Sequence, residues 1–166
     1  LASTLTEVTG ASNAVVPLVL AVFGAGLTAG NLFVPRFADR ALMPTAGVLL
    51  VWSAVVLALY PWASGSLAAI TACVFAIGCG GALATVLQTR LMDVAGDAQG
   101  LAAALNHSAF NVANAIGPWA GGLAIAGGYG WASTGYVGSA LALGGLAIWA
   151  LTLLVERYRR GRPALA

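Results

Sequence analysis

Three long stretches of this 166-residue chain contain no charged residue, and they limit what the chain can fold into. They are residues 8–35, 41–89 and 98–155. A helix needs about 20 apolar residues to cross the hydrocarbon core of a bilayer. The first stretch is long enough for one such helix, and each of the others is long enough for two. We therefore predict an all-α polytopic membrane protein with five transmembrane helices.

The composition excludes a soluble globular domain. Hydrophobic residues make up 60% of the chain and charged residues 7%, with a mean hydropathy of +0.93. In a soluble domain, charged residues account for roughly a quarter of the sequence. The lipid bilayer is therefore the expected surroundings of most of these side chains.

Turn-forming residues interrupt each of the two longer stretches once, at residues 60–66 and 127–131. Both interruptions are rich in Gly, Pro or Ser and carry no charge, which is typical of tight hairpin turns. The predicted organisation is an external loop (1–12), spans at about 14–35, 45–62, 67–89, 100–126 and 132–155, and a tail (156–166).

The basic residues predict the orientation of the chain. All seven are Arg, and they fall in three clusters, within residues 36–40, 90–97 and 156–162. Five spans place these three clusters on one side of the membrane. Short basic loops are retained in the cytoplasm, so we predict a cytoplasmic C-terminus, with Glu7 and both hairpin turns on the external side.

No pattern of catalytic or metal-binding residues is present in the predicted spans. His107 has no Cys, Asp or Glu at ligand spacing. Cys73 and Cys79 lie roughly 240° apart around a helix, so they do not face each other. The Arg clusters are explained by topology and form no aromatic-lined basic groove for nucleic acid. We predict no enzyme activity, no cofactor, no metal and no nucleic-acid partner.

Polar and small residues mark the protein-facing sides of membrane helices, because apolar residues gain nothing there from packing against each other rather than lipid. The first predicted helix carries Thr28 and Asn31, and the third carries Thr85, Thr89 and Gln88. We predict that Thr28, Asn31 and Gln88 line a cavity for the solute. Small residues lie beside them, at Gly26, Gly30, Gly78 and Gly81. The second and fifth helices are apolar nearly all round, so we expect both to face lipid.

The fourth predicted helix is the most polar, with five polar side chains in nine residues: Asn106, His107, Ser108, Asn111 and Asn114. Hydrogen bonding between helices is one interpretation. The other is the wall of a cavity open to a solute. We favour the cavity because five polar groups exceed what packing requires, and because an ionisable group inside a membrane indicates function by default.

Residues 117–122 of the same helix, GPWAGG, predict a kink or hinge. Proline removes a backbone donor there, and glycine allows close approach of other backbones. The residues concerned are Gly117, Pro118, Gly121 and Gly122, and a purely structural kink is the alternative.

Several runs of the sequence resemble the major facilitator superfamily, in its drug:proton antiporter branch near the arabinose-efflux-like and chloramphenicol-exporter-like permeases. They are LTEVTG (5–10), GNL (30–32), RFADR (36–40), LQTRLMDVAGDAQ (87–99) and ALNHSAFN (104–111). The resemblance covers essentially the whole chain. It implies that the five helices correspond to the eighth through twelfth of a twelve-helix transporter of the cell inner membrane.

The resemblance also implies roles for individual residues. Asp39 and Arg40 match the end of a cytoplasmic gating motif, although Pro35 replaces the first glycine of that motif. The 117–122 run is similar to the end of the antiporter motif that family members carry in the fifth of their twelve helices. The upstream glycines of that motif are absent, so its antiporter meaning does not transfer.

On this resemblance we expect the C-terminal half of a secondary transporter that exports a small organic solute, drug-like or sugar-like, in exchange for protons. Alternating access would move it against an N-terminal half. The spans contain no Asp, Glu, Lys or Arg, so the proton carrier lies in that other half unless His107 serves. The alternatives are a non-transporting membrane fragment or assembly module, and a proton-coupled importer.

Overall fold

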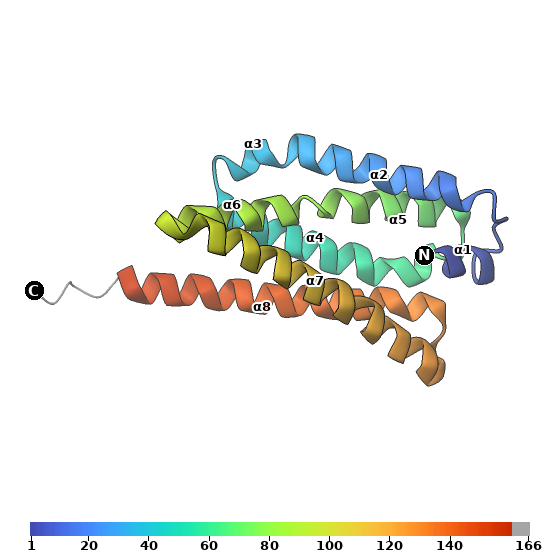
Figure 1. Ribbon diagram of the computed structural model, residues 1–166. Helices are drawn as coiled ribbons and strands as arrows, with labels where there is room; N and C mark the ends of the chain where they lie inside the picture. Colours follow the sequence, from blue (N-terminus) through green and yellow to red (C-terminus); the bar gives the residue numbers. More distant parts are fainter. Residues whose placement is uncertain (161–166) are drawn as a thin grey trace, which may run out of the picture.

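The computed structural model of the protein describes residues 1–160, which form helices joined by short turns, with no strand in that range (Figure 1). The helices are α1 (Ala2–Glu7), α2 (Val16–Phe33), α3 (Pro35–Ala38), α4 (Leu42–Ala63), α5 (Leu67–Gly80), α6 (Leu83–Ala95), α7 (Gln99–Ala124) and α8 (Thr134–Arg160). The prediction of an all-α protein is confirmed.

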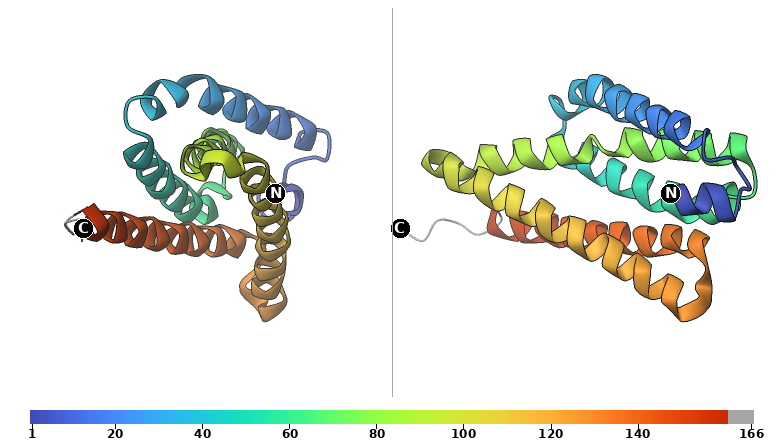
Figure 2. Two further views of the ribbon diagram at one scale, coloured as in Figure 1. Left: turned by 60° about the vertical axis from the view of Figure 1, so that its left-hand side comes forward. Right: turned by 45° about the vertical axis from the view of Figure 1, so that its right-hand side comes forward.

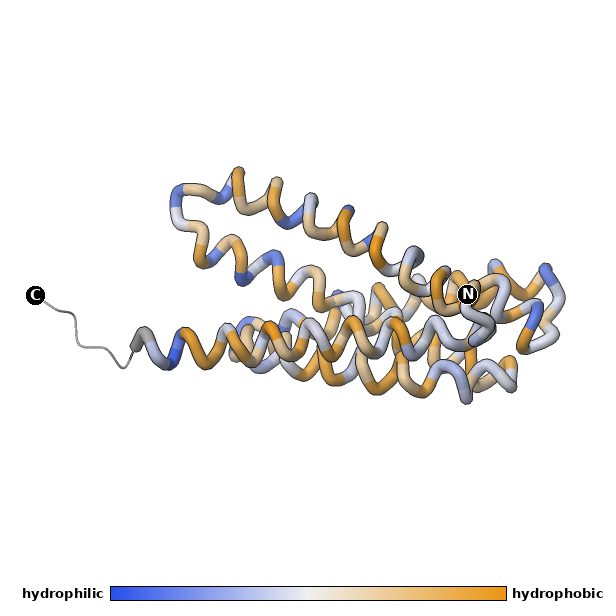
Figure 3. The backbone as a smooth tube through the Cα atoms, turned by 90° about the horizontal axis from the view of Figure 1, so that it is seen from below, coloured by the Kyte–Doolittle hydropathy of each residue, from blue (hydrophilic) through white to orange (hydrophobic). Residues whose placement is uncertain are grey.

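Four continuous helical stretches of the described chain are long and apolar enough to cross a membrane: Val16–Ala38, Leu42–Ala63, Leu67–Tyr129 and Trp131–Tyr158. The third folds back on itself at Gly96, where φ is +53°, so that α5 and α6 run one way and α7 returns (Figure 1). Hydrophobic positions occur along all of these stretches (Figure 3). This is the architecture of a polytopic membrane protein.

The two ends of the bundle differ in charge. One end, which we call the arginine end, carries Arg36 on α3, Arg40 on the α3–α4 connection, Arg90 on α6 and Arg157 on α8. The opposite, tip end holds α1 and the α4–α5 and α7–α8 turns (Figure 1). Helix α7 begins beside α6 at the arginine end and ends beside α8 at the tip end (Figures 1 and 2).

Helices α2 and α5 touch backbone to backbone. A Cβ atom built on Gly26 would overlap the Phe75 carbonyl oxygen, and one built on Gly30 would overlap the Cys79 carbonyl oxygen. From the other side, a Cβ on Gly78 would lie 2.5 Å from the Phe23 carbonyl oxygen. Small residues are what permit such close approach in a membrane helix pair.

Helix α4 packs on one side and is exposed on the other. One of its sides is buried against α5 and α8, through Ala46, Gly47, Leu49, Leu50, Ala54, Val56 and Tyr60. The opposite side, with Val48, Val55 and Leu59, is exposed. A helix that is apolar on every side gives no indication of which side packs, because protein and lipid are equally apolar partners.

Three hydrogen bonds from side chains to main-chain carbonyl groups tie α4 to its neighbours, one donated by α4 to α5 and two donated by α8 to α4. The three bonds, each 2.8 Å long, run from Trp52 Nε1 to the Ala76 carbonyl, from Ser139 Oγ to the Ala54 carbonyl and from Trp149 Nε1 to the Met43 carbonyl. The Trp149 indole also lies directly against Gly47, where an added Cβ would overlap the ring. Helix α8 is otherwise mostly exposed, as expected of a lipid-facing helix.

The segment 1–12 is not a loop throughout, as the sequence had suggested. It contains α1, and Leu5 and Thr4 of that helix are 0% and 1% exposed. Leu5 packs with Tyr60 and Ile70 at the tip end, and Thr9 Oγ1 donates to the Ser64 carbonyl at 2.8 Å. A helix of only six residues is too short to produce a recognisable periodic pattern.

The third expected helix, 67–89, is two helices separated at Gly81 and Ala82. The Gly81 amide donates to the Gly78 carbonyl at 2.9 Å, and the Ala82 amide donates to the Cys79 carbonyl at 3.4 Å. This spacing of three residues, instead of four, is a local tightening of the helix. By contrast, α7 continues through Pro118 without ending, and the left-handed turn comes later, at Gly128 with φ of +85°.

Candidate functional site

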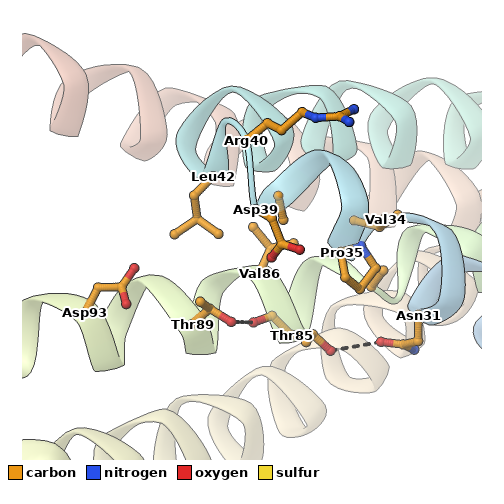
Figure 4. Close-up of a pocket in the computed structure, with 12 residues that line it drawn as sticks. Asn31, Val34, Pro35, Asp39, Arg40, Leu42, Thr85, Val86, Thr89 and Asp93 are labelled. Atoms are coloured by element: carbon orange, nitrogen blue, oxygen red, sulfur yellow. Dashed lines mark hydrogen bonds between the residues drawn. The ribbon is translucent and has the colours of Figure 1, made fainter.

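A polar cavity of about 310 Å³ opens at the arginine end, between the α2–α3–α4 segment and α6. Its polar lining comes from two stretches of the chain far apart in sequence: Asn31, Asp39 and Arg40, and Thr85, Thr89 and Asp93 (Figure 4). Two carboxylates, two hydroxyls, one amide and one guanidinium are therefore collected around one space. This mixture suits a polar solute or water better than lipid.

The charged groups of the cavity are arranged unevenly. Asp39 directs its carboxylate toward α6, whereas the Arg40 side chain extends away from both Asp39 and Asp93 (Figure 4). Residues 1–158, whose side chains the structure describes, form one ion pair, and it includes neither Asp39 nor Arg40. The two residues taken from the gating motif are thus close in space but not paired.

Asn31 and Thr85 are joined across the cavity wall. Thr85 Oγ1 donates to Asn31 Oδ1 at 2.9 Å, and Asn31 Nδ2 donates to the Leu27 carbonyl, also at 2.9 Å (Figure 4). The sequence placed Asn31 among the cavity residues and Thr85 only on an interior face. The bond between them could not be foreseen, because 54 residues separate them.

The other predicted cavity residues lie outside this space. Thr28 Oγ1 bonds back to the Gly24 carbonyl at 3.0 Å, and Gln88 is exposed on α6. On α7, His107, Asn111 and Asn114 are exposed and Asn106 is partly buried. None of these four α7 side chains has a hydrogen-bond partner within the described part of the chain.

The four predicted hinge residues, Gly117, Pro118, Gly121 and Gly122, line a separate cavity of about 320 Å³ at the tip end. Gly121 is buried, and a Cβ built on it would lie 3.4 Å from Thr134 Cγ2 on α8. A Cβ on Gly117 or Gly122 would meet nothing within 4 Å. Of the three glycines, Gly121 alone therefore has a packing role inside this chain.

An ion pair between Arg90 and Glu156 fastens α6 to α8 at the arginine end. Arg90 Nη2 lies 2.5 Å from Glu156 Oε1, and the two side chains are 34% and 28% exposed. Topology explained Arg90, but its pairing with Glu156 was not predicted, since no periodicity links positions 66 residues apart. A partly exposed pair of this kind stabilises by about 1 kcal/mol or less.

The described residues contain no group of three or more His, Cys, Asp or Glu side chains able to hold a metal ion. Cys73 and Cys79 are both free thiols. The chemistry available at the cavity is hydrogen bonding and charge complementarity.

Comparison with known proteins gives one consistent result. The sequence profile of the Major Facilitator Superfamily matches residues 1–166. The inner membrane transport protein YdhP of Escherichia coli K12 is 34% identical over 160 residues, which cover 96% of this chain and 40% of YdhP. The YdhP protein of E. coli O157:H7 is also 34% identical, over 167 residues, with the same coverage.

The uncharacterized MFS-type transporter YfhI of Bacillus subtilis is 33% identical over 119 residues, which cover 70% of this chain and 30% of YfhI. No solved structure matches the chain. The chain spans about 40% of the length of the YdhP proteins that it matches.

Proposed function

The chain belongs to the major facilitator superfamily, and on that premise we propose that it is the C-terminal half of a proton-coupled exporter of a small organic solute. It is part of a membrane transporter and not of an enzyme. A drug-like or sugar-like solute would cross by alternating access, with this half moving against an N-terminal half. Protons would be carried mainly by groups of that other half.

The observation that carries the proposal is the unpaired polar side of α7. Asn111 and Asn114 are exposed there, and the described part of the chain offers their side chains no partner. In hydrocarbon, each polar group that lacks a hydrogen bond costs several kcal/mol. These amides therefore face water, solute or the opposite half of the transporter, and a central cavity supplies all three.

The cavity at the arginine end supports a gate at the cytoplasmic mouth. Asp39 has no basic partner among the described side chains, so its carboxylate is available to another helix. A carboxylate at a helix N-terminus contributes about 0.3 to 1 kcal/mol when exposed. We assign Asp39 to such a contact with the N-terminal half, with Arg40 beside it.

Transport by the complete protein in bacterial cells that lack their own exporters tests the proposal. Radiolabelled chloramphenicol and arabinose serve as probes, because the resemblance is to exporters of those kinds. We expect lower accumulation of one probe than in cells with an empty vector, and a return to the control level with a proton uncoupler. Higher accumulation than in the empty-vector cells indicates an importer. If both probes accumulate to the same level as in the empty-vector cells, the proposed solute class is overturned.

Fusion reporters test the orientation. A fluorescent protein that folds only in the cytoplasm should be bright after Ala166 and within the 36–40 connection. The same reporter inserted in the 127–131 turn should be dark, and alkaline phosphatase at that turn should be active. These results follow from the excess of Arg at one end of the bundle. A dark fusion after Ala166 contradicts the five-span orientation.

A further inference from the structure

We infer that Thr85 is a positioning residue, which turns the Asn31 carboxamide so that its second N–H donates to an oxygen of the transported solute. The inference rests on the proposed transport function and names one recognition contact within it. The solute it implies carries a hydrogen-bond acceptor, such as a carbonyl or hydroxyl oxygen. Both residues line the cavity at the arginine end.

The neighbours of Asn31 determine which way its amide points. The Leu27 carbonyl can only accept a hydrogen bond, so the Asn31 atom 2.9 Å from it must be the nitrogen. The oxygen therefore faces Thr85, and the Thr85 hydroxyl must donate to it. Rotating the amide by half a turn would set Asn31 Oδ1 against the Leu27 carbonyl oxygen, two acceptors, and lose that bond. The bond from the Thr85 hydroxyl holds the carboxamide in its present position. One N–H of Asn31 remains unused.

Thr85 behaves differently from five other hydroxyls of the long helices. Thr28, Thr71, Thr89, Ser108 and Thr152 each donate to the carbonyl four residues earlier in their own helix. For Thr85 that acceptor would be the Gly81 carbonyl, which lies in the tightened turn and accepts from the Ala84 amide, three residues on, at 3.1 Å. The tightened turn between α5 and α6 thus leaves the Thr85 hydroxyl available to α2.

The close contact of α2 and α5 brings Asn31 within reach. Gly30, the residue before Asn31, lies directly against the Cys79 backbone, which precedes the turn that leads to Thr85. The two helices can approach so closely only because Gly30 has no side chain. Asn31 and Thr85 are consequently held at hydrogen-bond distance by the backbone packing beside them.

The orientation of Asn31 is measurable without a solute, by exchange of its side-chain amide protons in protein labelled with ¹⁵N-asparagine. The signals of Asn31 are those lost in Asn31→Asp. Thr85→Val should raise exchange of the bonded proton about three- to tenfold, the range expected for one hydrogen bond in a membrane protein. Thr85→Ser should restore the wild-type rate. Thr71→Val is the matched control, because that hydroxyl bonds within its own helix and lies outside the cavity, and it should leave the exchange of the Asn31 protons unchanged.

Transport kinetics then test the role of the contact. For the exported probe, Thr85→Val should raise KM about three- to tenfold with kcat unchanged, and Thr85→Ser should stay near wild type. In an Asn31→Ala background, Thr85→Val should have no further effect, since Thr85 acts through Asn31.

Additive effects of the two substitutions, or an unchanged KM in Thr85→Val, overturn the inference. Unchanged exchange in Thr85→Val overturns it as well, whether or not a probe is transported. If the wild-type protein moves neither probe, the proposed function fails, and the exchange rates alone decide whether Thr85 orients Asn31.

Discussion

Alanine at Gly26 lowers the free energy of unfolding by about 1–3 kcal/mol, the usual cost of inserting extra atoms into a packed contact. The added methyl group overlaps the Phe75 carbonyl oxygen, which belongs to a helix backbone and cannot rotate away. The two helices must therefore move apart along the whole α2–α5 contact. Unfolding in mixed micelles with increasing dodecyl sulfate, followed by circular dichroism, measures the change.

Gly24 provides the matched control for Gly26, two residues earlier on the same helix. A Cβ built on Gly24 meets nothing within 4 Å. Gly24→Ala should be neutral or stabilise by up to about 1 kcal/mol, because alanine has the higher helix propensity. Alanine is thus expected to destabilise at Gly26 and not at Gly24. Equal destabilisation by both would mean that the α2–α5 contact is not as close as described here.

Removal of the amide at Asn111 or Asn114 should reduce transport about tenfold, the equivalent of one hydrogen bond of roughly 1.4 kcal/mol to the solute. Stability should change by less than about 0.5 kcal/mol, as for other exposed side chains. Efflux of the exported probe, divided by the amount of folded transporter in the membrane, measures the effect for Asn111→Ala and Asn114→Ala.

Ser108→Ala is the control on the same helix. Its hydroxyl bonds back to the Ala104 carbonyl at 3.0 Å, so its removal should leave efflux near wild type. If Asn111 and Asn114 instead bond the opposite half, their loss costs about 0.6 kcal/mol of stability, and efflux falls only in proportion to folded protein. Unchanged efflux in both variants removes the α7 stripe from the solute path.

The features of the fold that could be predicted are those set by local sequence. Long uncharged stretches predicted helices, and Gly26 and Gly30 marked a side of α2 that packs closely. The buried side of α4 could not be predicted, since lipid and protein are equally good partners for Val or Leu. The break at Gly81 was also missed, because the hydropathy of residues 67–89 is continuous across it.

The candidate site was predictable only in part for a related reason. Asn31 stood out because an amide inside an apolar helix requires a partner. Which partner it finds depends on the register between α2 and α6, and no single sequence contains that register. Thr85 and Asp93 were therefore not assigned to the site, and the pairing of Arg90 with Glu156 was not foreseen either.

The three bonds that hold α4 have an evolutionary consequence. In each, a side chain donates to a main-chain carbonyl, so the bond requires a particular amino acid only at the donor position. Met43, Ala54 and Ala76 accept through atoms that every amino acid possesses. Selection can thus act on Trp52, Ser139 and Trp149 while their acceptor positions drift, and methods that infer contacts from paired substitutions will be blind to these bonds.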